Sequence, residues 1–461
     1  MSKIEKEEKI IGLKHKARRR SIKEGIFASA SGAFGGQFIS PFAIAINSSS
    51  SLVALYGAIA GLLGPISQMH GSRLMEKESR KKIVLRGVLW EALLWLPFIL
   101  VGFLFYKGLA LNLLPYLLIA AYTLQVVMAS MASPAWFSWV GDIVDEQYRG
   151  RWFSKRNLIH GFIALILALI SSFFLDYFKK LGLNMFGFII LFSLALIFRM
   201  ISWQLFKGQY EPKLKLKKAD YFSFQDFLKK APATNFGKFT IFRIFLSFAT
   251  AVASPLIAVY LLRNLQFNYV TYIIITLAGS IFSLAVLELW GKIADKYGNY
   301  RVMLLNAFLI PAIPILWILS PNPVYLVIVP SIIGGMAWAG FNLSAGNFIY
   351  DNARQEKRGL CVSYSNMLIG IGTFLGAGLG AILIKFIQTS LIEPMIIIFI
   401  ISGILRMLVV IFGIGKIKEV RKISKFYGVK SLENVIIKQA KPTFIEEAHQ
   451  LMSIKKYIFN A

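Results

Sequence analysis

The sequence predicts an all-α membrane protein with about twelve transmembrane helices in two six-helix, pseudo-symmetric halves. Hydrophobic residues make up 56% of the 461 residues and charged residues only 16%, whereas soluble domains contain about 45–50% and about 25%. Apolar segments of about 20 residues recur along the chain, and each is long enough to cross a hydrocarbon core of roughly 30 Å as a helix. Charged loops also occur twice, at matching places in the two halves.

The predicted helices follow one another with short connections, and a longer basic linker divides the chain near its middle. The expected spans are 22–46, 50–69, 83–106, 111–140, 157–176, 184–206, 238–262, 269–290, 302–319, 322–350, 360–384 and 394–415. The predicted parts are a cytoplasmic basic segment at 1–21, an N-terminal half at 22–206, a cytoplasmic linker at 207–237, a C-terminal half at 238–415 and a cytoplasmic tail at 416–461. The hydrophilic first segment has no apolar core of signal-peptide type, so no cleavage is expected.

The net charge of +28 at pH 7 is a topology signal. Most of the 51 Lys and Arg residues lie in alternate connections, which share one side of the membrane. By the positive-inside rule, we expect the protein to lie in the cell membrane with this side and both termini facing the cytoplasm. We therefore expect membrane lipids as partners and no nucleic acid. The single cysteine, Cys361, permits no intrachain disulfide.

Four sequence elements occur in the same order in both halves. Asp142 and Arg149 match Asp351 and Arg358 at one offset of 209 positions, since 351 − 142 and 358 − 149 are equal. The other matched pairs are Glu76 with Asp295, Lys82 with Arg301, Ser40-Pro41 with Ser254-Pro255, and Arg199-Met200 with Arg406-Met407. Six spans return a chain to its starting side, so the repeat predicts two halves in parallel orientation.

One of these loops carries a family resemblance. The segment GKIADKYGNYR (291–301) resembles the G-x-x-x-D-[RK]-x-G-[RK]-[RK] signature of the major facilitator superfamily of secondary transporters, and SRLMEKESRKK (72–82) is a degenerate first copy. The paired D-x6-R elements resemble the E-x6-R pairs of the sugar-porter branch, but the linker lacks the P-E-S-P-R type segment of that branch. The resemblance covers about residues 22–415 and leaves the branch open.

The repeated charges fall at helix ends on one side, which favours a gate. An acid at a turn can accept hydrogen bonds from a neighbouring helix N-terminus, and arginine offers a planar fork to carboxylates. The resemblance implies that Glu76 meets the eleventh helix near Gly359 and that Asp295 meets the fifth near Gly150. The predicted gate residues are Glu76, Lys82, Asp142, Arg149, Asp295, Arg301, Asp351 and Arg358. The alternative is a set of solvated loop charges that contribute about 0–1 kcal/mol per pair.

Small residues and prolines predict how some helices pack and bend. Gly57 and Gly61 lie four apart in the second span, and the eleventh carries three glycines at the same spacing, Gly372, Gly376 and Gly380. Such spacing lets helix backbones approach closely, and the resemblance places these two helices against each other across the interface between the halves. Two prolines at matching places in the first and seventh spans, Pro41 and Pro255, are expected to bend them.

Polar residues present in only one half are the candidates for solute binding. Arg243, Ser247 and Thr250 share one face of the seventh span, where the arginine either attracts an anionic solute or extends to the cytoplasmic interface. The resemblance places the first, fourth, seventh and tenth helices around the cavity. The further candidates on these helices are Gln37, Gln125, Trp136, Trp338 and Asn342. Amides beside indole rings suit a sugar-like or amphipathic solute, whereas tryptophan in a membrane helix also serves packing and the interface belt.

Glu91 is the candidate for proton coupling, since its repeat counterpart is the apolar Ile310. The alternative is a structural ion pair with Arg199 in the sixth span. His160 lies near the cytoplasmic end of the fifth span and is a weak candidate for a proton relay.

The function predicted from these features is secondary active or facilitative transport of a small solute by alternating access in a monomer. A proton or another ion is the candidate coupling partner. The competing class is a non-transporting receptor or lipid-handling protein on the same scaffold. The sequence contains no Walker loop, no H-E-x-x-H pair and no nucleophile elbow, so neither an enzyme, a metal site nor a cofactor is expected.

Overall fold

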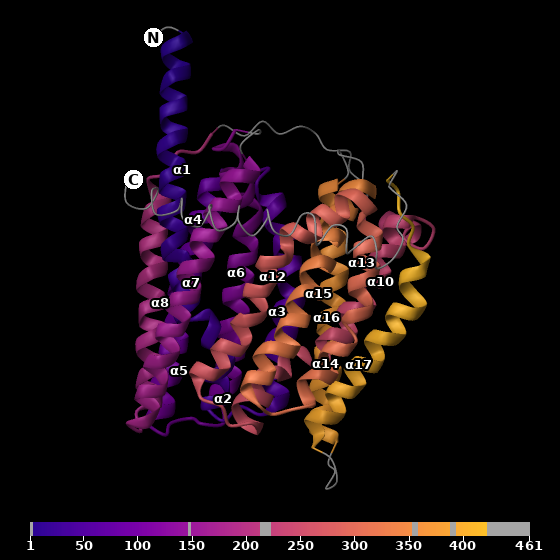
Figure 1. Ribbon diagram of the computed structural model, residues 1–461. Coiled ribbons are helices and arrows are strands. Elements are labelled where there is room, and N and C mark those ends of the chain that lie inside the picture. The colour runs from indigo at the N-terminus through magenta and orange to yellow at the C-terminus, as the bar shows by residue number, and fades with distance from the viewer. Residues whose placement is uncertain (1–2, 146–148, 213–222, 353–357, 388–392, 422–461) are drawn as a thin grey trace. The chain divides into compact units, whose positions relative to one another are not determined.

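The computed structural model describes residues 3–145, 149–212, 223–352, 358–387 and 393–421, and these residues are helical throughout apart from short connections (Figure 1). Eleven helices or runs of helices in this part of the chain are long and apolar enough to cross a membrane. They begin and end within a few residues of the second to twelfth predicted spans. The prediction of an all-α membrane protein with about twelve helices is therefore confirmed.

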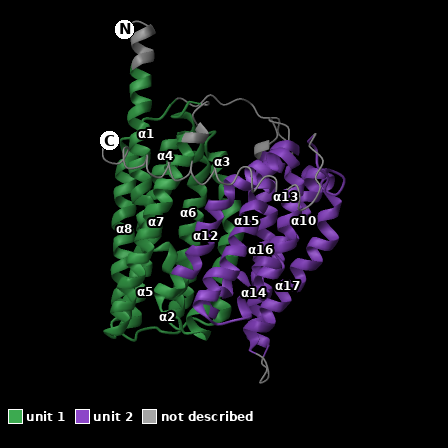
Figure 2. Ribbon diagram, in the orientation of Figure 1, with its two compact units in different colours: residues 1–218, 261–273 green, residues 219–260, 274–461 purple. Residues whose placement is uncertain are grey.

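The chain forms two compact units, shown in different colours in Figure 2. Unit 1 contains residues 1–218 and 261–273, and unit 2 contains residues 219–260 and 274–461. The helices that lie wholly in unit 1 are α1 (Lys3–Phe34), η1 (Gly36–Phe38), α2 (Ile39–Ala45), α3 (Ser50–Leu74), α4 (Arg80–Leu93), α5 (Trp95–Tyr106), α6 (Leu114–Asp142), α7 (Arg149–Lys180) and α8 (Asn184–Lys207). The remaining helices are α9 (Phe224–Lys230), α10 (Asn235–Ala251), η3 (Ser254–Leu256), α11 (Ile257–Val259), η4 (Tyr260–Asn264), α12 (Tyr269–Tyr297), α13 (Asn299–Leu309), α14 (Ala312–Ile318), α15 (Pro323–Asn352), α16 (Arg358–Phe386), α17 (Pro394–Gly413) and η5 (Ile414–Lys416).

The two units pack their helices in the same order. In unit 1, α1 contacts α7 and α8, and α4 contacts α6. In unit 2, α10 contacts α16 and α17, and α13 contacts α15. Each partner occupies the same place in its half of the chain, so the sequence repeat corresponds to a repeated packing arrangement.

The first helix of each half is broken near its proline. In unit 1, α1 ends at Phe34 and the 3-10 turn η1 precedes α2, which contains Pro41. In the second half, α10 ends at Ala251 and Pro255 lies in the 3-10 turn η3. Proline lacks a backbone N–H and its ring clashes with the preceding turn, so the predicted bends occur in both. Because of this break, the expected first span at 22–46 is the end of α1 together with η1 and α2, not one helix.

The predicted glycine face of α16 packs inside unit 2. A Cβ atom at Gly372, Gly376 or Gly380 would collide with the backbone carbonyl groups of Ile244, Phe248 and Val252 respectively. These carbonyls lie on α10 and directly after it, so the glycines allow close contact between α16 and α10. This glycine spacing therefore serves packing between helices of one unit.

Two polar contacts repeat at the helix ends of both units. Arg80 Nη1 donates to Asp142 Oδ2 at 2.6 Å in unit 1, and Asn299 Nδ2 donates to Asp351 Oδ2 at 2.7 Å in unit 2. Arg80 and Asn299 are also repeat counterparts, because they are 219 positions apart, as are Glu76 and Asp295. Each contact ties the start of the third span of a half to the end of its fourth. The Gly298 that precedes Asn299 has a φ of 93°, a conformation that glycine adopts without strain.

The two ends of the linker make defined hydrogen bonds. Arg80 Nη2 donates to the carbonyl of Pro212 at 2.7 Å, and Trp139 Nε1 donates to the carbonyl of Tyr210 at 2.9 Å. At the other end, Ser223 and Asp226 form a capping box at the start of α9. The hydrogen bonds from Ser223 lower the pKa of Asp226, because they stabilise its carboxylate.

The segment 261–273 packs with unit 1 although it follows α10 in the chain. Arg263 Nη2 donates to the carbonyl of Ser48 at 2.7 Å. The backbone N–H groups of Tyr269 and Val270 donate to the two carboxylate oxygens of Asp176, at 2.8 and 2.9 Å. A carboxylate from α7 thus caps the start of α12 and satisfies amides that have no partner within the helix.

Candidate functional site

Two adjoining cavities in unit 1 are lined by a group of charged side chains. Their volumes are about 490 and 260 Å³, and their shared wall includes Glu91, Arg156 and Arg199. The larger cavity also reaches His160 and Gln125, and the smaller reaches Glu24 and Trp136. These side chains come from α1, α4, α6, α7 and α8.

Four charged side chains form a continuous cluster between these helices. Arg156 Nη2 lies 3.4 Å from Glu24 Oε2, and Arg199 Nη2 lies 2.5 Å from Glu91 Oε2. Arg199 Nη1 also lies 3.9 Å from Glu24 Oε1, so this guanidinium stands between two carboxylates. Glu24 is only 2% exposed, whereas the side chain of Glu91 is 23% exposed. With two acids and two bases, the cluster has no net charge when all four are ionised.

The cluster is held by close packing and hydrogen bonds. Ser202 Oγ donates to Glu24 Oε1 at 2.9 Å, and His160 Nε2 lies 3.1 Å from the carbonyl of Ile22. Gly25, next to Glu24, has no side chain where the His160 ring and the Arg156 guanidinium lie, and a Cβ there would overlap both. Glycine at this position is what lets α7 bring its charged side chains against α1.

Aromatic and amide groups complete the cavity walls. The guanidinium carbon of Arg156 lies 4.9 Å from the centroid of a Trp136 ring, a cation–π contact. Gln125 is buried, and its Nε2 donates to the carbonyl of Glu91 at 3.4 Å. Tyr122 and Trp95 line the larger cavity. The structure therefore places Gln125 and Trp136, both predicted, beside the charged cluster.

Glu91 and Arg199 form the ion pair that was the alternative to a coupling role, and this pairing is confirmed. The pair does not exclude coupling, because Glu91 also faces both cavities.

At the positions of unit 2 that match this cluster, the described residues include the bases Lys238 and Arg406 but no acid. Arg406, the repeat counterpart of Arg199, is 4% exposed. Its Nη1 donates to the carbonyl of Ile310 and its Nη2 to that of Thr250, each at 3.3 Å. Ile310 is the repeat counterpart of Glu91, so a backbone carbonyl takes the place of the carboxylate. Of the two matching sites, the one in unit 1 alone contains carboxylates within the described ranges.

Unit 2 has its own cavity of about 590 Å³ between α12, α14 and α15. Its walls are apolar with several hydroxyl groups, including those of Ser280 and Ser283, and Trp338 lines it. Asn342 is not part of this wall and is exposed.

The remaining predicted solute-binding residues do not converge on one site. Arg243 and Ser247 are half-buried on α10, and the guanidinium carbon of Arg243 lies 5.8 Å from the ring of Phe239. No ion pair of Arg243 with an acid occurs among the described residues. The side-chain oxygen of Thr250 is buried without a hydrogen-bond partner in this part of the chain. Gln37 lies in η1 and is exposed.

The predicted gate residues have mostly local partners where they are described. Asp142 and Asp351 bind Arg80 and Asn299, as given above, and Asp295 lies 3.9 Å from Arg421. Lys82 lies 3.9 Å from Glu78, one helical turn away. Glu76 is exposed, and Arg301 lies at the start of α13. The helices α7 and α16 begin at Arg149 and Arg358, whose side chains lie outside the described part.

Sequence reasoning missed Glu24, Arg156 and Arg80. Arg156 lay outside the expected fifth span, which began at 157, whereas α7 begins at Arg149. Glu24 lay at the start of the expected first span, beside the basic N-terminal segment, and was not singled out. A usable signal was present, since the repeat counterparts of Glu24 and Arg156 do not preserve their charge: they are Lys238 and Ser365. Arg80 had a polar counterpart, Asn299, since the two occupy the same place in the aligned segments 72–82 and 291–301.

No group of three or more His, Cys, Asp or Glu side chains within the described ranges could hold a metal ion.

Comparison with known proteins finds one family profile and several solved structures of similar fold. Residues 239–441 match the profile of the Major Facilitator Superfamily. A mutant form of the nucleoside transporter NupG superposes with a TM-score of 0.66 at 12% identity, covering 88% of this chain and 100% of that one. A bacterial homologue of the iron transporter ferroportin in an inward-facing state gives 0.65 at 16% identity, with 87% and 98% covered. A D-xylose-proton symporter gives 0.65 at 13% identity, with 88% and 98% covered.

No curated protein sequence matches the chain. The likeness to the solved structures is therefore evidence for the fold, and the profile match is evidence for the family of the second half. The chain therefore has the fold of these transporters, and its second half matches the profile of the Major Facilitator Superfamily.

Proposed function

We propose that this protein is a secondary transporter of the major facilitator superfamily and that it carries a small polar solute. We further propose that the charged cavity of unit 1 binds this solute and that Glu91 couples its movement to protons. The observation that supports this most directly is the position of Arg199 between the carboxylates of Glu24 and Glu91. Ionisable groups within membrane-spanning helices are costly, and they persist where they are paired or serve function.

The geometry supports an exchange of partners at Arg199. When Glu91 accepts a proton on its carboxylate, it loses the negative charge that holds Arg199 at 2.5 Å. Glu24, now 3.9 Å from the guanidinium, becomes the stronger attraction for it. Partial exposure of Glu91 to the cavity gives the proton a path from water, whereas Glu24 is buried. Protonation thereby changes the shape and charge of the solute cavity.

The cavity chemistry favours a neutral polar or zwitterionic solute. The cluster has no net charge, so it does not select for an ion of one sign. Indole and phenol rings from Trp95, Trp136 and Tyr122 offer apolar faces, and the Gln125 amide offers hydrogen bonds. Sugars, nucleosides and amino acids fit this description, and the solved structures named above include transporters of a nucleoside and of D-xylose.

The Glu91→Gln variant tests the binding and coupling roles together. We expect one class in a panel of amino acids, pentoses, hexoses, nucleosides and organic anions to raise the thermal unfolding temperature of the purified wild type in detergent. The shift should depend on pH in the wild type and become independent of pH in Glu91→Gln, because the titrating group is gone. In proteoliposomes, an imposed pH gradient should accelerate uptake by the wild type only.

Glu288→Gln is the matched control, because Glu288 pairs with Lys292 on α12 and lines neither cavity. It should behave as the wild type. An unchanged pH dependence in Glu91→Gln would refute coupling by this residue. An anion whose binding is lost in Arg243→Ala, but kept in Glu91→Gln, would instead assign the solute site to α10. Binding without uptake would favour a receptor.

We further propose that the repeated cytoplasmic charges act as a gate. The local pairs of Asp142 with Arg80 and of Asp351 with Asn299 support this, since they hold two acids at equivalent helix ends. Moving a two-state equilibrium from 1:99 to 99:1 takes about 5.5 kcal/mol, which a few such charges supply when partly buried.

The single cysteine provides a reporter for the gate. Cys361 is partly exposed near the start of α16. We expect Arg149→Glu, a charge reversal in the other half, to change the rate at which a maleimide labels Cys361 by severalfold. Lys229→Glu on α9 makes the same charge change outside the predicted gate and should leave the rate unaltered. Equal rates in the wild type and both variants would leave these residues as solvated loop charges.

A further inference from the structure

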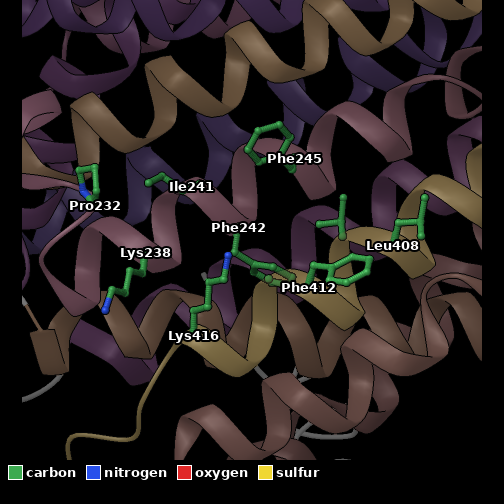
Figure 3. A pocket seen from close by; sticks show the side chains of 10 residues that line it. Pro232, Lys238, Ile241, Phe242, Phe245, Leu408, Phe412 and Lys416 are labelled. Carbon is green, nitrogen blue, oxygen red and sulfur yellow. The ribbon is translucent and has the colours of Figure 1, made fainter.

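A groove in unit 2 lies apart from the charged cavity and combines an apolar wall with two lysines. It has a volume of about 470 Å³ and runs between α10 and α17. Figure 3 shows Lys238 at the end of the groove near Pro232, and Leu408 at the opposite end. The volume lies within the range of about 300–1,000 Å³ that is typical of small-ligand sites.

The apolar wall faces outward along spanning helices. Phe245, Leu408 and Phe412 line the groove and are 55%, 45% and 68% exposed. They lie in the segments Asn235–Asn264 and Pro394–Lys416, both long and apolar enough to cross a membrane. Large apolar side chains exposed on such segments are expected to contact acyl chains.

The two lysines lie where those segments end. Lys238 is in the first turn of α10, and Lys416 closes the 3-10 turn that follows α17. Their ammonium groups therefore belong to the level of lipid headgroups, on the side predicted to be cytoplasmic. Neither ammonium pairs with a carboxylate in the part of the chain that the structure describes.

The nearest acid along the chain from Lys416 is already engaged. Glu419 accepts hydrogen bonds from the backbone N–H groups of Tyr300, Val420 and Arg421. Its charge is thus committed to the start of α13 and to its own turn. The lysines remain available to an anion that enters the groove.

Gly413 makes room for the ring of Phe242, and both residues line the groove. A Cβ atom at Gly413 would lie 2.7 Å from the Phe242 ring, closer than atoms can pack. The absence of a side chain lets this ring lie against the end of α17. The ring continues the apolar wall up to the lysines, so one ligand can contact both.

We propose that this groove binds one anionic phospholipid, with its phosphate between Lys238 and Lys416 and an acyl chain along Phe245, Leu408 and Phe412. The pattern requires an ion and a long apolar chain in the same molecule, which a phospholipid of the inner leaflet supplies. Basic residues at this level attract anionic headgroups, and the apolar wall holds the attached chain. The inference does not depend on the identity of the transported solute.

The test measures lipid retained by the purified full-length protein in native mass spectrometry. Phosphatidylglycerol and phosphatidylcholine with identical acyl chains are compared, because they differ only in the headgroup, which is anionic in the first and zwitterionic in the second. We expect the wild type to retain one phosphatidylglycerol in preference. The double variant Lys238→Gln/Lys416→Gln should weaken this retention by roughly tenfold or more. The matched control is Lys229→Gln/Lys230→Gln, which removes the same charge from the exposed lysines of α9.

A second variant tests the apolar half of the site. Leu408→Trp narrows the groove and keeps both lysines, so it should also lower phosphatidylglycerol retention. Equal retention in the wild type and the double lysine variant would overturn the proposal. Full competition by inorganic phosphate, or by the headgroup glycerophosphoglycerol without acyl chains, would also overturn it in favour of a simple anion site. Unchanged thermal unfolding of each variant separates lost binding from lost folding.

Discussion

Replacing Glu24 with alanine should lower the free energy of unfolding by about 3–5 kcal/mol, the usual cost of removing one partner of a buried ion pair. The carboxylate is 2% exposed and lies within 4 Å of both Arg156 and Arg199. Without it, Arg156 would be buried with no acid within ion-pair distance in the described structure. Equilibrium unfolding by sodium dodecyl sulfate in mixed micelles measures the loss.

The control for this prediction is Asp145→Ala. Asp145 pairs with Lys14 and Arg18, but its side chain is 51% exposed, so its loss should cost about 0–1 kcal/mol. The double variant Glu24→Ala/Arg156→Ala should recover part of the stability, because it removes the unpaired charge as well. A loss for Glu24→Ala no larger than that for Asp145→Ala would show that the cluster is fully hydrated.

Replacing Gly376 with valine should lower the free energy of unfolding by about 3 kcal/mol, at the upper end of overpacking costs. Any side chain at this position meets the backbone carbonyl of Phe248. A backbone group cannot change rotamer to make room, so α16 has to move away from α10 along the whole glycine face. The same detergent titration measures the change.

Gly378 offers a matched control two residues along the same helix. A Cβ at Gly378 has no atom within 4 Å, so Gly378→Val should change the free energy of unfolding by less than about 0.5 kcal/mol. The difference between the two variants then measures helix contact and not helix propensity, since both make the same replacement in α16. Equal effects of the two variants would contradict the packing argument.

Most of the fold was predictable from local patterns. The second to twelfth spans follow from runs of apolar residues, because the length needed to cross a hydrocarbon core is fixed by helix geometry. The equivalent positions of the repeated acids were also predictable, but their partners were not. Asp142 and Asp351 do occupy equivalent places, yet their partners are Arg80 and Asn299, each at the start of the third span of the same half.

The candidate site was predictable only where a charge stood alone in an apolar run. Glu91 and Arg199 met this criterion, and their pairing was foreseen. Glu24 and Arg156 did not, because each lies near a cluster of basic residues that resembles a loop. Their burial results from contacts of α1 with α7 and α8, which are remote from it in sequence.

By itself, the sequence determined the membrane class, the approximate helix boundaries and the internal repeat, because each depends on residues close together in the chain. Only the tertiary structure decided which charges are buried and which glycines touch a neighbour. A helix pattern defines an apolar face, but the partner of that face is set by packing among all the helices of a unit. Gly376 and Gly378 are the same residue type on one helix, yet α10 lies against the first and not against the second.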